Sequence, residues 1–282
     1  MNFHQSVSNT KGDLVKLKRK EKLLEEEKQF IKKEEEIIKE GEKKIIEDEK
    51  ELFLECEKKW VFLLLMMSGG FMGAFTYTIR GNVFCNAQTG NMVLMGIALG
   101  DANWLEAAYL LIPISAYFLG AIISEILPKK IKKINFLRWD TCLIGFEVLV
   151  LIALGFVPES APFQISQVAI NFICSMQYNT FRQAEGIPMA TTFCTNHLRQ
   201  TGVHLIKWLK KKDKKAKARF FLHIFMLGMF IAGAAVGTVL SRLILGKAIW
   251  GAAVIMMIIF IGLFRADRTK EKGMLERVPK GH

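Results

Sequence analysis

The chain has 282 residues, of which 51% are hydrophobic, and its formal net charge is +12. The charge is unevenly distributed, because residues 1–59 hold 15 Lys and Arg against 16 Asp and Glu, which leaves 24 against 11 for residues 60–282. Long uncharged runs separate the basic clusters of this second part, and about 20 apolar residues cross the hydrocarbon core of a bilayer. This pattern excludes a soluble fold and predicts an all-α polytopic membrane protein.

The first 59 residues are predicted to form a charged helical arm on the cytoplasmic side. Residues 11–59 are rich in Lys, Glu, Leu and Ile and contain no proline, which favours one long helix. Leu or Ile recurs every seven residues, at positions 17, 24, 31, 38, 45 and 52. The partner position three or four residues away is mostly Lys or Glu. Two alternatives therefore stay open: a self-associating coiled coil, or a solvated amphipathic helix on the membrane or on the transmembrane bundle.

The basic clusters determine the predicted number of spans. Four clusters, at residues 58–59, 129–138, 207–219 and 265–280, should all lie in the cytoplasm by the positive-inside rule. If every apolar run crossed, eight spans would place the second cluster outside. We therefore expect six spans and cytoplasmic termini, with eight spans as the alternative. The expected spans lie near residues 60–79, 105–126, 141–158, 161–181, 219–242 and 247–264. Residues 60–266 then form the transmembrane domain, and 267–282 a basic cytoplasmic tail.

The two remaining apolar runs, 81–100 and 186–208, are expected to enter the membrane and leave on the same side. Residues 89–99 would form a helix of about 16 Å, half of a core about 30 Å thick. Residues 82–88, if extended, are long enough to reach mid-depth. Thr89 is the predicted N-cap of this half-helix.

These two runs also belong to a predicted internal repeat. Aligning Thr89-Gly90-Asn91 with Thr195-Asn196-His197 brings Gly81 opposite Gly186 with a single gap. Further on, residues 116–124 resemble residues 229–237. With three spans in each half, the two halves (about 60–158 and 161–264) have opposite orientations. We therefore expect an inverted repeat in which the two half-helices meet by their N-termini near the midplane.

Two stretches resemble the signatures of the YoaK-like bacterial membrane proteins, a family of unknown function. They are SGGFMGAFTYTIRGNVFCNAQTGNMVLMGIALG (68–100) and QYNTFRQAEGIPMATTFCTNHLRQTG (177–202). The resemblance covers about residues 58–266 and implies six spans, without a substrate or a reaction. Two departures stand out: Gly73 replaces an Asp that is common in the family's first span, and Asn196-His197 replaces the expected Gly-Asn. If the family transports by way of that Asp, coupling is altered or lost in this chain.

Polar side chains at membrane depth are costly unless they are paired or face a cavity, so those near the half-helices are candidate ligands for a small solute. The alternative is that they only satisfy the backbone of the non-helical stretches. Glu147 lies in mid-span, where it is expected to pair with an arginine, to relay protons, or to make an interhelical hydrogen bond in its neutral form. The candidate substrate-binding residues are Asn86, Gln88, Thr89, Gly90, Asn91, Thr192, Thr195, Asn196, His197 and Glu147, with Thr191 beside them.

Other polar and small residues of the spans are given structural roles. Arg80 and Arg182 end their spans and are expected to extend to the lipid headgroups. Asn171 and Gln177 are expected to link helices by hydrogen bonds. Close helix packing is expected at Gly120, Gly228, Gly233 and Gly237.

Catalytic motifs are absent from the sequence, which contains no phosphate-binding loop, paired-His zinc motif, nucleophile elbow or dinucleotide fingerprint. We therefore expect no enzymatic activity, no metal and no cofactor. The expected function is a transporter or channel-like permease for a small polar or anionic solute, in the inner (plasma) membrane of a bacterium. The alternative is a non-transporting scaffold or sensor acting through the arm. Expected partners are the lipid bilayer and, at the Lys/Arg clusters, anionic headgroups, but not nucleic acid. The solute, the coupling ion and the oligomeric state, including a homo-oligomer, stay open.

Overall fold

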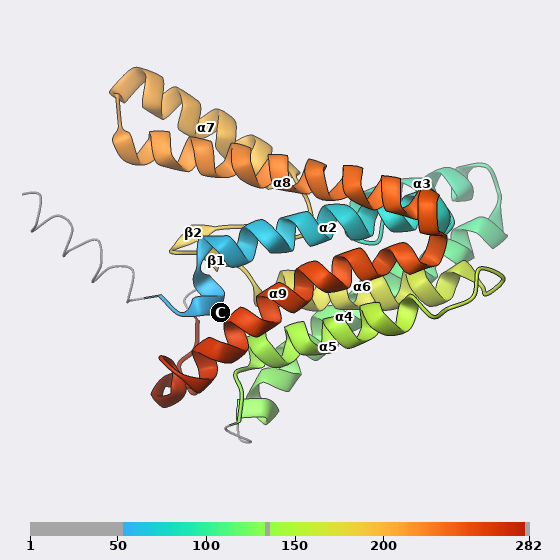
Figure 1. Cartoon of the computed structure of the whole chain (residues 1–282). Coiled ribbons are helices and arrows are strands. Elements are labelled where there is room, and N and C mark those ends of the chain that lie inside the picture. Colours follow the sequence, from blue (N-terminus) through green and yellow to red (C-terminus); the bar gives the residue numbers. More distant parts are fainter. Residues whose placement is uncertain (1–52, 133–135, 280–282) are drawn as a thin grey trace, which may run out of the picture. The chain divides into compact units, whose positions relative to one another are not determined.

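A computed structural model describes residues 53–132 and 136–279, coloured along the chain in Figure 1. The arm up to residue 52, with its coiled-coil pattern, lies outside the described residues. The α-helices are α2 (Lys59–Ile79), α3 (Gln88–Gly100), α4 (Trp104–Lys132), α5 (Trp139–Leu154), α6 (Phe163–Thr180), α7 (Thr195–Lys211), α8 (Lys214–Ile244) and α9 (Ile249–Arg268). Short 3-10 helices are η1 (Glu55–Glu57), η2 (Leu245–Ala248) and η3 (Lys272–Met274). The all-α prediction is confirmed.

Uncharged apolar runs account for most of these helices. In the described part of the chain, three segments are long and apolar enough to cross a membrane: Lys59–Ile79, Trp104–Pro128 and Lys214–Arg268, the last of which holds both α8 and α9. Helices α2, α4, α5, α6, α8 and α9 coincide with the predicted spans to within a few residues, except that α4 and α8 extend further at their charged ends. Helices α3 and α7 fall in the two runs that were expected to be broken.

Contacts between loops define two ends of the helical bundle. At one, the Arg80 end, the Arg80 guanidinium pairs with Glu159 at 2.6 Å, and the backbone N–H of Gly246 donates to the same carboxylate at 2.6 Å. At the other, the Arg138 end, the backbone N–H of Arg138 donates to Asp267 at 3.0 Å. Helices α2, α4, α5, α6, α8 and α9 run between these ends in alternating directions, as Figure 1 shows.

The predicted position of Arg80 is wrong. Instead of extending outward, its side chain is 2% exposed and is held by Glu159, which belongs to the loop before α6. Both terminal nitrogens of the guanidinium donate to the two oxygens of Glu159, at 2.6 and 3.4 Å, and such bidentate pairs are among the stronger hydrogen bonds in proteins. Arg182, by contrast, stays 40% exposed and contacts Glu125 at 3.4 Å.

Glycines allow the main helix pairs to approach closely. Helix α2 packs most extensively on α8, α4 on α6, and α5 on α9. A Cβ at Gly233 would overlap the carbonyl oxygen of Met67, and a Cβ at Gly120 would overlap that of Phe172. Gly237 is similarly close to α2. Gly228 is the exception, because no atom in the described part of the chain lies within 4 Å of a Cβ placed there.

A small hairpin that the sequence analysis did not predict follows α6. Strand β1 (Gln183–Ala184) pairs antiparallel with β2 (Ile187–Pro188). Both residues of the connecting turn, Glu185 and Gly186, have positive φ, at 47° and 74°, which is the backbone of a tight hairpin turn. The Glu185 N–H donates to the carbonyl of Glu57 at 2.8 Å, which holds the hairpin at the Arg138 end.

Candidate binding site between the two interrupted helices

The chain reverses after α2 and returns into the bundle. Gly81 has φ +82° and Asn82 has φ 54°, a left-handed backbone that suits glycine. The Asn86 side-chain N–H then donates to the carbonyl of Gly69 at 3.0 Å, at the middle of the 21-residue helix α2. Helix α3 begins at Gln88 and has 13 residues, about 20 Å, which is too short to cross a core of about 30 Å. The first segment, residues 81–100, therefore consists of a non-helical stretch followed by the short helix α3, which begins about halfway along the bundle. We call this arrangement an interrupted helix.

The second segment reaches the same glycine from the Arg138 end. A Cβ at Gly69 would lie 2.8 Å from the carbonyl oxygen of Thr191 and 3.4 Å from the Cα of Thr192. Helix α7 starts shortly afterwards, at Thr195. The non-helical parts of both segments thus meet at one residue, which has no side chain to keep them away.

Two side chains of α6, Gln167 and Asn171, hold the first segment in place. The Gln167 side chain donates to the carbonyl of Arg80 at 2.7 Å. One turn along α6, Asn171 accepts a hydrogen bond from Gln88, the first residue of α3. The predicted interhelical role of Asn171 is therefore confirmed. Gln167 was missed, although it lies four residues before Asn171 and so on the same helix face.

Several buried polar atoms of the two segments have no hydrogen-bond partner within the described residues. Asn91 donates to the carbonyl of Phe84 at 3.0 Å, but within the described residues its own Oδ1 accepts nothing. The hydroxyls of Thr191 and Thr192 are fully buried and form no hydrogen bond there, although the Tyr117 hydroxyl lies close to that of Thr192. Such atoms are rare in native proteins, because leaving one unsatisfied costs about 1–3 kcal/mol. We call Gly69, Asn86, Asn91, Thr191 and Thr192 the central site.

The other predicted ligands near the two helix starts lie outside the central site. Thr89 is exposed, and the predicted N-cap role is wrong: α3 starts at Gln88 after the N-cap Ala87, whose side chain offers no acceptor. Thr195 is exposed as well, and Asn196 accepts a hydrogen bond from Arg199 at 3.1 Å on the surface. The aligned pair Thr89 and Thr195 therefore marks the two helix starts to within one residue without lining a site. Among the described residues, the Phe84 ring is the one group within 4 Å of a Cβ placed on Gly90, at 3.8 Å.

Gly73, the departure from the family pattern, faces Asn86. A Cβ placed on Gly73 would lie 2.9 Å from the Asn86 Nδ2 and 3.1 Å from its Oδ1. Asn86 therefore occupies the space into which a side chain at residue 73 would extend. A larger side chain at this position would extend toward Asn86 of the central site.

Glu147 lies on α5 and is completely buried. Neither of its carboxyl oxygens has a hydrogen-bond partner in residues 53–132 and 136–279, so neither the predicted arginine partner nor the predicted interhelical hydrogen bond is found. No hydrogen bond joins it to the central site in that part of the chain. Gln177 on α6 likewise has no partner for either side-chain atom there, contrary to its predicted linking role.

His197 belongs to a group of buried histidines between α7 and α8. Its Nδ1 lies 3.0 Å from the Nδ1 of His223, and its Nε2 lies 2.8 Å from the carbonyl oxygen of Ala190. The ring of His204 stacks on that of His223 at 5.9 Å. His204 lies seven residues after His197, so both occupy one face of α7, a sequence signal that was missed. Among the described side chains, no three His, Cys, Asp or Glu are placed to hold a metal ion.

The model of one protein family, described as "Protein of unknown function (DUF1275)", matches residues 61–262. The chain belongs to the DUF1275 family. The resemblance to the YoaK-like proteins is confirmed at this level, because they are members of the same family. No curated protein and no solved structure matches the chain. The matched region of this DUF1275 protein contains the central site and all of the helical bundle except the first two residues of α2 and the last six of α9.

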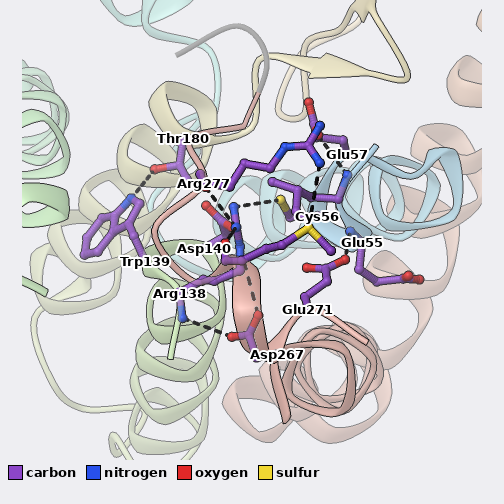
Figure 2. Close-up of polar contacts among 12 residues, drawn as sticks. Glu55, Cys56, Glu57, Arg138, Trp139, Asp140, Thr180, Asp267, Glu271 and Arg277 are labelled. Carbon is purple, nitrogen blue, oxygen red and sulfur yellow. Dashed lines mark hydrogen bonds and ion pairs between the residues drawn. The ribbon is translucent and has the colours of Figure 1, made fainter. Parts of the chain in front are cut away.

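A second polar cluster, outside the predicted site, closes the Arg138 end (Figure 2). Arg138 is 4% exposed, and its Nε donates to Asp140 at 3.0 Å. Its Nη1 donates to the carbonyls of Met274 and Arg277 at 3.2 and 2.9 Å, and its Nη2 contacts the sulfur of Cys56 at 3.8 Å. One guanidinium thus joins the residues before α2, the start of α5 and the chain after α9. Sequence reasoning treated Arg138 only as part of a basic loop.

The groups around Arg138 are shielded from solvent. Glu271 accepts a hydrogen bond from the N–H of Glu55 at 2.7 Å, and burial raises the pKa of its carboxyl. Burial, together with the charge of Asp140, raises the pKa of the Cys56 thiol well above its usual value. A cavity of about 280 Å³ lies beside the cluster, lined by residues of both charge signs. In this DUF1275 protein the cluster therefore joins the segment before α2 and the segment after α9 to the start of α5.

Proposed function

We propose that the chain is a six-span protein of a bacterial inner membrane, built as an inverted repeat, which carries a small polar or anionic solute. The observation that carries this proposal is the meeting of both interrupted segments at Gly69, which Asn86 contacts from the first segment and Thr191 from the second. Broken helices that meet at mid-depth form the substrate sites of many secondary carriers.

The distribution of charge supports six spans. Lys59 and Arg138 belong to the Arg138 end, and Arg268 stacks on Phe136 at 5.0 Å, close to the same loop. Arg219, at the start of α8, lines a groove together with Lys59. The basic clusters therefore gather at one end, as the positive-inside rule requires of a cytoplasmic face. If α3 and α7 enter the membrane without crossing it, the six helices α2, α4, α5, α6, α8 and α9 remain to span it.

The packing supports the inverted repeat. Exchanging α2–α5 with α6–α9 converts the α2–α8 contact into α6–α4 and the α3–α4 contact into α7–α8, and returns α5–α9 to itself. All of these contacts are present. The aligned glycines behave alike: Gly81 and Gly186 both have positive φ, and Gly120 and Gly233 both touch a backbone carbonyl of the partner helix.

The chemistry of the central site supports a small polar or anionic solute. Asn91 offers an unpaired acceptor, and the hydroxyls of Thr191 and Thr192 offer donors. The N-terminal turns of α3 and α7 add unpaired backbone N–H groups and the positive ends of two helix dipoles. No charged side chain belongs to the site, which favours a solute that is small and carries at most a low charge. The alternative of a scaffold acting through the arm rests on residues 1–52, outside the described part.

A transport role and a purely structural role of Thr192 lead to different expected effects of its replacement by valine. Its buried hydroxyl has no partner in the described residues, so Thr192→Val should preserve or raise thermal stability. If the hydroxyl binds solute, the same change should slow transport at least tenfold.

The measurement is stopped-flow light scattering on proteoliposomes with glycerol, urea, chloride, phosphate and sulfate as probes. Thr89→Val, at an exposed position, is the matched control. Equal rates in Thr192→Val and wild type, or no flux of any probe above empty liposomes, would reject the proposal.

A further inference from the structure

An open groove of about 390 Å³ lies at the Arg138 end, between the start of α2, strand β2 and the first turns of α8. It is lined by Lys59, Ile187, Ala218, Arg219, Phe221, Leu222 and Phe225. None of the proposed solute-binding residues belongs to it.

The lining changes from charged to apolar along α8. Lys59 and Arg219 provide the cations at one end. Phe221 and Phe225 are 51% and 57% exposed and continue the lining toward the uncharged part of the helix. From Ala218 to Phe225 the helix rises about 10 Å, a length that accommodates the first part of an acyl chain. The groove is therefore cationic at one end and apolar at the other, which matches the anionic headgroup and the apolar acyl chain of a phospholipid.

The positive charge of the groove is only partly neutralised. Lys59 pairs with Glu185 of the hairpin at 2.5 Å. Arg219 is exposed and, within the described residues, makes no hydrogen bond or ion pair, so one guanidinium is left to receive an anion. It precedes the uncharged run that begins at Phe220, in a segment that is apolar enough to cross a membrane.

We propose that this groove binds an anionic phospholipid, with the phosphate at Lys59 and Arg219 and an acyl chain along Phe221 and Phe225. Basic pockets at the cytoplasmic ends of membrane helices attract anionic headgroups, each Lys or Arg contributing about 1 kcal/mol. A bound lipid would join α2, the hairpin and α8. The proposal goes beyond the transport function and does not depend on it.

The test is a competition between two lipids on the detergent-solubilised full chain. The protein is offered equal amounts of phosphatidylglycerol and phosphatidylcholine with the same acyl chains, and bound lipid is counted by native mass spectrometry. We expect a several-fold preference for phosphatidylglycerol, which Arg219→Gln should lower about fivefold. Lys247→Gln removes an exposed cation near the Arg80 end and should leave the preference unchanged. Equal binding of the two lipids, or an unchanged preference in Arg219→Gln, would overturn the proposal.

A second arm separates a lipid from a free phosphate. Phe225→Gln alters only the apolar end of the groove and, because Phe225 is exposed, should leave the fold intact by circular dichroism. It should reduce phosphatidylglycerol retention, while soluble glycerol 3-phosphate should not compete with the lipid. Full competition by glycerol 3-phosphate, with no effect of Phe225→Gln, would instead show a simple anion site.

Discussion

Arg80 and Glu159 form an ion pair of 2.6 Å in which the guanidinium is buried and the carboxylate is half exposed. The same carboxylate accepts the backbone N–H of Gly246, so three loops converge on one side chain. The Arg80 guanidinium also lies 5.5 Å from the centre of the Phe75 ring. This ion pair therefore holds the loops together at the end of the bundle opposite the Arg138 cluster.

Replacing Glu159 should destabilise the fold. Glu159→Gln leaves a buried guanidinium without its counter-charge, and we expect a loss of about 1–2 kcal/mol, less than for a fully buried pair because Glu159 is half exposed. Thermal unfolding in detergent, followed by circular dichroism, would measure it. Glu106→Gln, at an exposed residue bonded to Asn103, is the control. Identical melting of both variants would contradict the assigned role of the pair.

The pair should also give a defined pH dependence. The hydrogen bond from Arg80 lowers the pKa of Glu159 below its ordinary value of 4.5. A lowered folded-state pKa contributes stability that is fully present above the unfolded value and is lost as the pH falls through the folded value. The stability difference between wild type and Glu159→Gln should therefore be constant near neutral pH and shrink below pH 4.5. Melting curves from pH 3 to pH 7 would show this convergence, and a gap that widens in acid would refute it.

Two glycines of α8 should respond oppositely to alanine. Gly233→Ala places a methyl group against the carbonyl of Met67 and should cost about 1–3 kcal/mol by forcing α2 and α8 apart. At Gly228 a Cβ meets nothing within 4 Å in the described residues, so Gly228→Ala should stabilise the helix by about 0.5–1 kcal/mol. Thermal unfolding of the two variants side by side measures the difference. Equal effects would mean that α2 and α8 are not in close contact.

A side chain at residue 73 should displace Asn86. The Cβ of Gly73→Ala would lie 2.9 Å from Asn86, and the loop that holds Asn86 also holds the buried Cys85. We expect faster modification of Cys85 by a small maleimide in this variant. Gly96→Ala, where a Cβ meets nothing within 4 Å among the described residues, should leave the rate unchanged. No acceleration in Gly73→Ala would show that the loop tolerates the side chain.

Topology can be tested at two exposed residues, Asp101 after α3 and Lys212 after α7. Six spans place Asp101 outside and Lys212 in the cytoplasm. In eight spans, the segment 81–100 would cross and bring Asp101 inside. Asp101→Cys should therefore react with a membrane-impermeant maleimide in intact cells, whereas Lys212→Cys should react only after lysis. Protection of Asp101→Cys in intact cells would favour eight spans.

Features set by local composition could be predicted from the sequence. Uncharged runs located the long helices, because this signal is contained in short stretches. Features that need a distant partner could not. The burial of Arg80 depends on Glu159, and the pairing of His197 depends on His223 from another helix. The N-cap assignment to Thr89 failed for a smaller reason, since an oxygen-bearing side chain only favours a cap position and does not fix it.

The position of Gly69 has a mechanical consequence. Because both interrupted segments rest on the same point of α2, a movement of this point changes the contacts of both. A displacement of α2 along α8 would shift both helix starts at once. In the proposed carrier, such a displacement would couple the access to the site from the two faces of the membrane.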